Sequence, residues 1–538
     1  MTSLALLVFV GILISYQLIQ QAGRMNGGIT ETILLHGSSS LPSAVPNASS
    51  SIEVPGATPS AAPPPPTPPK DPRIDCQIVE QMKKENIVVV MRTGATESYT
   101  KLPIHFLTTL RCFEKGDVLF YSDVADSMAQ FEIEDILAKV PEATRSSNPD
   151  FEVYKQLQEH KASGQEMRDF PVEWSDEEHP KTWTLDKYKF MHMLEETYYA
   201  KPEAKWYVFM ETDTYVVWSN LLRYLRSLDP ANPLYLGSAA EVLGKPFAHG
   251  GSGFIITRTA LDKLFEGKER GAANKWDEIM INECCGDYIV GLSLLEADVK
   301  LHNIWPMING EYPATMPFGP NHWCQSLLTM HHIPPPEMSN VWRYEQERGY
   351  DTPLQIKDIY TKFIEPQLRS YRVVQSWDNL SDDLIYRPPG ATDTFRAPTG
   401  WLTEPEKEAH ISGENCELVC KSNRDCFQWL WRSGTGVGEK TMNEIQNRRE
   451  QESKKNLDNI DDAIRAGIAP SLKRDEEIDL DKGPICSLSK SIKLGTYVPG
   501  MDNKFAGPGA ELWVSGWDVE KIDKWVEDNQ CEAQWVVF

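Results

Sequence analysis

The chain has 538 residues, too many for one ordinary domain and enough for two or three, each able to bury a core. Its apolar fraction of 41% and aromatic fraction of 10% are those of a mostly globular protein. The formal net charge of -24 argues against a nucleic-acid partner, because such a chain does not neutralise phosphates broadly.

Residues 1–24 contain an apolar run without charged side chains, LALLVFVGILISYQLI from Leu4 to Ile19. A full membrane span needs about 17 to 25 residues, so the run is either a short signal anchor or the apolar part of a cleaved signal peptide. No Ala-x-Ala-like site follows it closely, which favours a retained transmembrane anchor. Arg24 follows the run and no basic residue precedes it, so charge gives no support for a cytosolic N-terminus.

Residues 25–70 are interpreted as a stem, since much of this segment is rich in Pro, Ser and Ala. Such a composition cannot bury a core and favours an extended, semi-rigid spacer. Ten cysteines beyond the apolar run, sequons at Asn47 and Asn379, and no second apolar span fit a body in an oxidising lumen. Together these features predict a single-pass type II protein of the Golgi or another secretory-pathway membrane.

Three apolar runs predict buried strands of a parallel sheet, with helical spacing between them. They are NIVVVMRTG (86–94), DVLFYSD (117–123) and KWYVFMETDTYVVW (205–218). The alternation is typical of βαβ units, in which ligands bind beyond the carboxyl ends of the strands. Arg92, Asp123 and the triplet Glu211-Thr212-Asp213 lie at those ends.

The acids of the triplet are costly if they are desolvated and unpaired, by several kcal/mol. They therefore either reach solvent as an ordinary turn or hold a cation. Three later motifs bear on this choice, and each has an ordinary structural interpretation as well: a tight turn, a helix N-cap and a buried histidine. They are FAHGGSGF with Gly250, Gly251 and Gly253, ECCGDYIVG with Asp287 in the place of an N-cap, and LLTMHHIPPPEM with His331 and His332.

The order of these four motifs resembles that of the Fringe-like glycosyltransferases, and most closely their core 1 β1,3-galactosyltransferase branch. The resemblance covers about residues 85–338. It implies a GT-A fold, which is α/β with a Rossmann-like, mostly parallel sheet, over a domain at 71–400. It also implies a UDP-sugar donor, a divalent ion, Mn²⁺ or Mg²⁺, and transfer with inversion to a glycan or glycoprotein acceptor.

The same resemblance assigns roles to individual residues. Asp213 matches the last acid of the family's Asp-x-Asp signature and would ligate the metal, as would His331, with His332 as the fallback. Glu211 stands where the family has Asp, so it would reach the ribose, or the metal through water, while Thr212 replaces an acid common in the branch. Arg92 and Asp123 are candidates for the nucleotide.

Asp287 matches the catalytic carboxylate, which would take the proton from the acceptor hydroxyl. The residue before it is Gly286, where the branch often has Glu. The turn of Gly250, Gly251 and Gly253 would lie against the sugar or the acceptor. Because Glu211, Thr212 and Gly286 depart from the branch, a second hypothesis stays open: a catalytically inactive lumenal relative that binds carbohydrate or protein.

Residues 401–538 have a different character, with a charged insertion at 438–483 that is interpreted as solvated helix or loop. The cysteine spacing here resembles that of PAN or apple modules, small disulfide-bonded α+β domains, which would pair Cys420 with Cys426 and Cys416 with Cys486. Each half of the body holds five cysteines, so either one bridge joins the halves or each keeps a free thiol. Cys531 is our candidate for a crossing bridge.

Overall fold

The computed structural model describes residues 74–173, 180–434, 482–498 and 511–538. The predicted anchor at 1–24, the stem at 25–70 and nearly all of the charged insertion at 438–483 lie outside these residues, as does the sequon at Asn47. Within the described ranges, no helix is both long and apolar enough to cross a bilayer.

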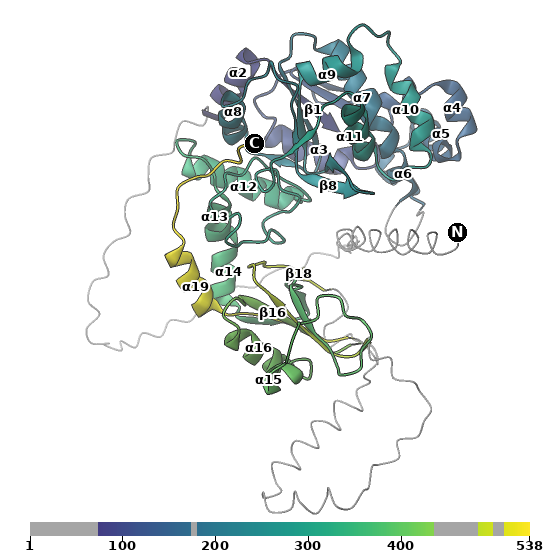
Figure 1. Cartoon of the computed structure of the whole chain (residues 1–538). Helices are drawn as coiled ribbons and strands as arrows, with labels where there is room; N and C mark the ends of the chain where they lie inside the picture. The colour runs from purple at the N-terminus through teal and green to yellow at the C-terminus, as the bar shows by residue number, and fades with distance from the viewer. Residues whose placement is uncertain (1–73, 174–179, 435–481, 499–510) are drawn as a thin grey trace, which may run out of the picture.

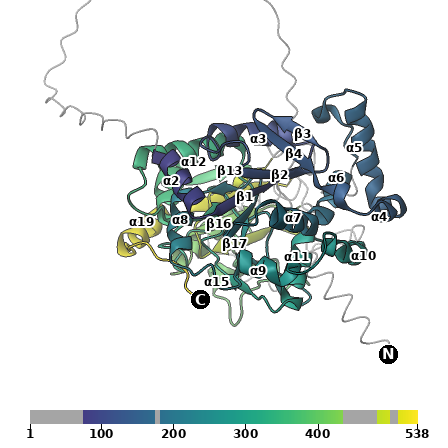
Figure 2. The ribbon, with the colours of Figure 1, turned by 90° about the horizontal axis from the view of Figure 1, so that it is seen from above.

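An eight-stranded mixed sheet organises the N-terminal half, in the order β11-β7-β10-β5-β1-β2-β4-β3 (Figures 1 and 2). Its strands are β1 (Ile87–Arg92), β2 (Val118–Ser122), β3 (Asp126–Met128), β4 (Phe131–Asp135), β5 (Trp206–Glu211), β7 (Tyr235–Gly237), β10 (Phe254–Thr257) and β11 (Leu301–Asn303). The three predicted strands, β1, β2 and β5, are confirmed as parallel neighbours. β10 instead runs antiparallel to both β5 and β7, so the sheet is mostly but not wholly parallel, consistent with GT-A.

Alternate residues of each central strand face two separate apolar layers. Val90 packs on one side, against α7 (Asp186–Ala200), α9 (Arg258–Phe265) and α11 (Gly286–Glu296). Val89 and Met91 pack on the other side, against α2 (Ile74–Lys84), α3 (Ser98–Leu107) and α8 (Trp218–Arg226). Coverage of both faces explains why these strands are continuous apolar runs, and it leaves only their ends for polar side chains.

Further elements complete this half and the connection that follows it. They are α4 (Glu142–Ser147), α5 (Glu152–Ala162), α6 (Lys181–Thr184), α10 (Lys275–Met280), α12 (Pro335–Arg348), α13 (Ile356–Ile359), α14 (Glu365–Ser370), β6 (Tyr215–Val216), β8 (Ala239–Val242), β9 (Lys245–Ala248) and β12 (Thr329–Met330). Helices α12 to α14 lead from the large sheet to a second body in Figure 1.

The second body is built on a five-stranded antiparallel sheet in the order β13-β19-β16-β17-β15. Its elements are β13 (Val373–Gln375), β15 (Leu384–Tyr386), α15 (Glu404–Lys407), α16 (Gly413–Ser422), β16 (Gln428–Arg432), β17 (Ile485–Ser489), β19 (Trp513–Trp517) and α19 (Val519–Asp528), with the small pair β14 (Trp377–Asp378) and β18 (Thr496–Tyr497). Because β13 and β15 precede residue 401, this sheet takes strands from both sides of the boundary that the sequence predicts.

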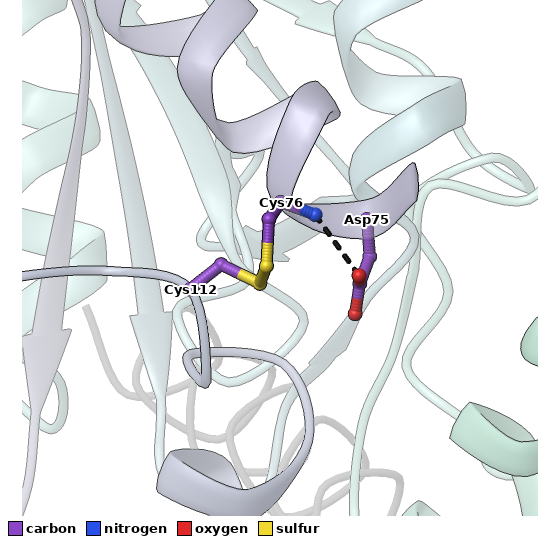
Figure 3. Close-up of side chains that lie close together, drawn as sticks. All are labelled: Asp75, Cys76 and Cys112. Carbon is purple, nitrogen blue, oxygen red and sulfur yellow. Dashed lines mark hydrogen bonds between the residues drawn. A yellow bond between two sulfur atoms is a disulfide. The ribbon is translucent and has the colours of Figure 1, made fainter. Parts of the chain in front are cut away.

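All ten cysteines lie in the described residues and all are in disulfides. The two pairs that the PAN resemblance implies, Cys416–Cys486 and Cys420–Cys426, are present. Cys324–Cys531 is the crossing bridge, as predicted for Cys531. The remaining pairs are the adjacent Cys284–Cys285 and Cys76–Cys112, which ties α2 to the segment after α3 (Figure 3).

The C-terminal tail returns from the second body to the first (Figure 1). Beyond Cys531, the Gln534 N–H donates to the Cys324 carbonyl at 2.9 Å, and the Ser326 N–H donates to the Gln534 carbonyl at 2.9 Å. The Trp535 ring stacks on Tyr224 of α8 with 5.9 Å between centroids. The two halves are thus joined by the tail as well as by the chain between them.

The sequon at Asn379 does not present its side chain to solvent. Asn379 is fully buried, and its amide nitrogen donates to the Trp429 carbonyl at 3.0 Å. Its side-chain oxygen accepts from the Ser381 hydroxyl at 2.8 Å. The folded protein therefore uses this side chain as a core hydrogen-bonding group, and the sequon no longer supports a lumenal location.

Candidate active site

Two very short strands bring the acid triplet and the histidine pair together. β6 begins two residues after Asp213, and β12 ends one residue before His331. They pair antiparallel, with Tyr215 opposite Met330, and the Ile333 N–H donates to the Asp213 carbonyl at 3.1 Å. As a result, ligand atoms of Asp213, His331 and His332 all lie within 4.8 Å of one another.

The donor atoms of this group are suited to a divalent ion. His331 Nε2 lies 3.3 Å from Asp213 Oδ1, yet among the described residues neither that oxygen nor His331 Nδ1 has a hydrogen-bond partner. Burial by itself raises the pKa of Asp213, but the positive charge of His331, followed by that of Lys101, outweighs it and holds this pKa well below its usual value. A partly buried, ionised carboxylate beside two imidazoles fits Mn²⁺ or Mg²⁺.

A second group of possible ligands, Asp75 with Cys76 and Cys112, does not form a metal site. The two sulfurs are bonded to each other, as Figure 3 shows, so neither is a thiolate. Asp75 Oδ1 accepts from the Cys76 N–H at 2.9 Å, and the same carboxylate pairs with Arg111. The Asp213 group is therefore the metal candidate within the described part of the chain.

The glycine turn contacts both the predicted base and a residue of the Asp213 group. The Gly250 N–H donates to Asp287 Oδ2 at 2.7 Å. A Cβ at Gly251 would stand 2.3 Å from His331 Cε1, closer than any real contact. Gly253 has a φ of +83°, which favours glycine. The turn thus contacts the base on one side and a candidate metal ligand on the other.

Asp287 lies in the first turn of α11, whose N-cap is Cys285, so the prediction that Asp287 is the N-cap is wrong. Its Oδ1 accepts from the Tyr288 N–H at 2.9 Å, and the residue is only 9% exposed. Burial raises the pKa of Asp287 to about 6, with the nearby Glu211 carboxylate also raising it, while the hydrogen bond from the Gly250 N–H opposes them. Such a carboxylate is ionised at neutral pH and basic enough to accept a proton.

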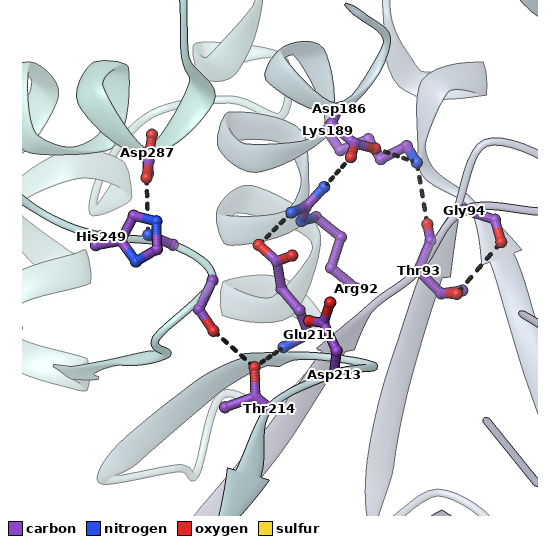
Figure 4. Close-up of polar contacts among 12 residues, drawn as sticks. Arg92, Thr93, Gly94, Asp186, Lys189, Glu211, Asp213, Thr214, His249 and Asp287 are labelled. Atoms are coloured by element: carbon purple, nitrogen blue, oxygen red, sulfur yellow. Dashed lines mark hydrogen bonds and ion pairs between the residues drawn. The ribbon is translucent and has the colours of Figure 1, made fainter. Parts of the chain in front are cut away.

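Glu211 does not join the Asp213 group but pairs with Arg92, which also binds Asp186 Oδ2 at 2.7 Å (Figure 4). Burial lowers the pKa of Arg92, but Asp186 and Glu211 outweigh it and raise this pKa above its ordinary value. Asp186 Oδ1 in turn lies 2.7 Å from the fully buried Lys189. This salt-bridge network fixes the end of β5 on that of β1.

Asp123 and Thr212 are buried rather than turned toward solvent. Asp123 Oδ1 accepts from the Ala95 N–H at 2.8 Å, and its Oδ2 lies 2.9 Å from Lys189 Nζ. Thr212 is 2% exposed, and its carbonyl contacts His105 Nε2 at 2.8 Å. Both residues shape the strand ends, and their contact with a nucleotide stays a prediction.

The sequence alone did not identify several polar residues of this site. Asp186 and Lys189 stand three apart on α7, a spacing that is also ordinary on exposed helices. His249 precedes the glycine turn directly and donates to, or accepts from, the Ser252 hydroxyl at 2.7 Å. Burial, with His331 nearby, lowers the pKa of His249 to about 4. Its place before Gly250 is the one signal that could have singled it out.

The fold is thus an α/β domain with a mostly parallel sheet. A carboxylate–histidine group that could hold a metal ion and a separate buried carboxylate lie at one edge of this sheet. The family model described as Fringe-like matches residues 82–298. The chain therefore contains a Fringe-like domain, and the Fringe family consists of glycosyltransferases. The match includes the triplet, the glycine turn and Asp287, while His331 and His332 lie beyond it.

Proposed function

We propose that the protein is a metal-dependent inverting glycosyltransferase that moves a hexose from a UDP-sugar to a glycan or glycoprotein acceptor. The observation that carries this proposal is the glycine turn, where Gly250 bonds Asp287 and Gly251 packs against His331. A candidate base and a candidate metal ligand therefore border one site, as a one-step displacement of a diphosphate requires.

Asp213 and His331 would hold Mn²⁺ or Mg²⁺, with His332 as the third donor. A bound ion would supply positive charge for the departing diphosphate. Asp287 accepts the proton of the acceptor hydroxyl while the hydroxyl oxygen attacks the anomeric carbon from the face opposite the diphosphate. Glu211 and Arg92 are assigned to the nucleotide side of the site, together with Asp123 and Thr212, at the ends of neighbouring strands.

The finer assignments rest on the resemblance to the core 1 branch and on the cysteine pairing. Galactose in a β1,3 linkage is the first expectation for the transferred sugar. The C-terminal body is proposed to be a PAN or apple-like domain, because Cys416–Cys486 joins α16 to β17 and Cys420–Cys426 joins α16 to the segment before β16. Five disulfides fit an oxidising compartment, and we propose a type II protein of the Golgi with its body in the lumen.

A catalytically inactive relative that binds carbohydrate or protein is the second candidate. One observation favours it: Glu211 pairs with Arg92 and is absent from the group of possible metal ligands among the described residues. Such a relative would keep the fold without turning over a donor.

The experiment that separates the two measures UDP release from a panel of UDP-sugars with Mn²⁺, repeated for Asp213→Ala. We expect release with at least one donor, lost on removal of Mn²⁺ and in Asp213→Ala. If the wild type releases no UDP from any donor, and calorimetry finds no Mn²⁺-dependent UDP binding, the enzyme proposal is wrong. Mass spectrometry of the product then identifies the sugar.

A further inference from the structure

Lys101 is a charged residue of the site that neither the family signature nor the proposed mechanism uses. It lies one turn into α3, which begins just beyond the end of β1. Its Nζ is 3.2 Å from Asp213 Oδ2 and 2.7 Å from Glu97 Oε2, and its side chain is 31% exposed. A cation therefore contacts a candidate metal ligand while keeping access to solvent.

Lys101 stands between two carboxylates, because its Nζ contacts both Glu97 and Asp213. Glu97 also holds the side chain near the site, because this pair stands at i,i+4 on the same helix end.

The contact with Asp213 becomes less favourable once another cation binds that carboxylate. A divalent ion ligated by Asp213 would bring two positive charges close to the Lys101 ammonium group, and like charges at this separation repel strongly. A UDP-sugar would place a diphosphate with unpaired oxygens at the same point. The ammonium group, with three donors on a flexible stem, is suited to bind it.

We infer that Lys101 is a diphosphate-binding residue, which neutralises Asp213 in the metal-free site and donates to the diphosphate once Asp213 ligates the ion. The inference rests on the proposed function, since it assumes a UDP-sugar. It predicts effects of opposite sign on two ligands: removal of the ammonium group strengthens the binding of Mn²⁺ alone and weakens the binding of UDP.

The test is calorimetric titration of the full chain, wild type and Lys101→Met, first with Mn²⁺ alone and then with UDP at saturating Mn²⁺. We expect Lys101→Met to bind Mn²⁺ several-fold more tightly. It should bind UDP about tenfold to a hundredfold more weakly, because a charge-assisted hydrogen bond is lost. Lys101→Arg should recover most of the UDP affinity. Thermal melting verifies that both variants fold.

Lys139→Met is the matched control, because Lys139 also bridges two carboxylates, Glu134 at 3.0 Å and Glu196 at 3.2 Å, with a side chain 37% exposed. It should change neither affinity. A parallel loss of Mn²⁺ and UDP binding in Lys101→Met would mean that Lys101 only supports the site, and unchanged UDP binding would also overturn the inference. A wild type that binds no UDP with Mn²⁺ would overturn the proposed function as well.

Discussion

At the scale of single residues, Asp287 has the property that a general base needs. Its pKa is raised to about 6, first by burial and then by Glu211, so the carboxyl is protonated below that pH and ionised above it. Only the ionised form accepts a proton. As the proposed base, Asp287 would therefore lose its function as the pH falls through about 6 and keep it at neutral pH.

This property predicts the pH dependence of transfer. At saturating Mn²⁺, so that protonation of His331 does not limit the rate, kcat/KM should rise about tenfold per pH unit below pH 6 and level off above it. Initial rates of UDP release between pH 4.5 and 8 measure the profile. A rate that stays constant down to pH 4.5 would show that Asp287 is not the titrating base.

Glu211 and Asp213 should differ although they stand two residues apart. Because Glu211 pairs with Arg92, Glu211→Gln should lower the free energy of unfolding. The loss should be only about 1–3 kcal/mol, because Arg92 keeps its salt bridge with Asp186. Its Mn²⁺ affinity should change by less than about threefold, under 1 kcal/mol. Asp213→Asn should abolish Mn²⁺ binding. Chemical denaturation and Mn²⁺ titration measure the two effects, and loss of Mn²⁺ binding in Glu211→Gln would return Glu211 to the metal ligands.

At the scale of elements, the glycine turn 250–253 is the part that couples the base to the metal group. A Cβ at Gly251 would lie 2.3 Å from His331 Cε1 and 2.4 Å from Nε2. The His331 ring would have to move away, because the hydrogen bond from the Gly250 N–H to Asp287 holds the backbone of the turn in place. Geometry at this turn therefore affects the metal ligand and the base together.

Gly251→Ala should weaken Mn²⁺ binding by more than about tenfold, the cost of displacing one ligand. Gly319→Ala is the control, because a Cβ at Gly319 meets its nearest atom at an ordinary 3.7 Å and its φ is not positive. Mn²⁺ titration of both variants measures the effect. Equal affinities in the two variants would contradict the role of the turn.

The elements also show which parts of the fold the sequence could predict. β1, β2, β5 and α7 follow from their apolar patterns, since strands buried on both faces leave continuous runs. The pattern says nothing of pairing partners, so the antiparallel course of β10 was not predicted. The sequence also did not predict that the second sheet begins at Val373. The reason is that β13 is a short, largely exposed strand without an apolar run.

The candidate site was predictable where motifs follow strand ends, and not where charges meet across the fold. Arg92 and Glu211 are 119 residues apart, and only the parallel register of β1 and β5, which puts them opposite each other, makes them a pair. Asp186 and Lys101 reach the site from the first turns of α7 and α3, where charged side chains are ordinarily solvated. Their roles depend on neighbours that the local sequence does not contain.

At the scale of the whole molecule, the two bodies share an apolar cluster. Tyr215 of the large body and Trp517 of the second body belong to it. The C-terminal tail adds a further link through Cys324–Cys531 and Trp535. The second body is therefore connected through one apolar cluster to the strands that carry the metal group, and its stability should affect theirs.

Trp535→Ala should lower the free energy of unfolding by about 1–3 kcal/mol, because the ring loses its stacking on Tyr224 and its packing against the large body. Trp401→Ala is the matched control, since Trp401 is fully exposed and its removal should change stability by less than about 0.5 kcal/mol. Denaturant unfolding compares them. Equal effects would mean that the tail does not stabilise the large body.

The proposed function depends on Asp287 as the base of a metal-dependent sugar transfer, beside a diphosphate site at Asp213 and His331. Its most direct test is the rate of transfer by Asp287→Asn, with UDP binding at saturating Mn²⁺ measured on the same preparation. The expected result is a rate reduced by a factor of about 10³ or more, with UDP affinity within about threefold of the wild type. Full transfer by Asp287→Asn would contradict it.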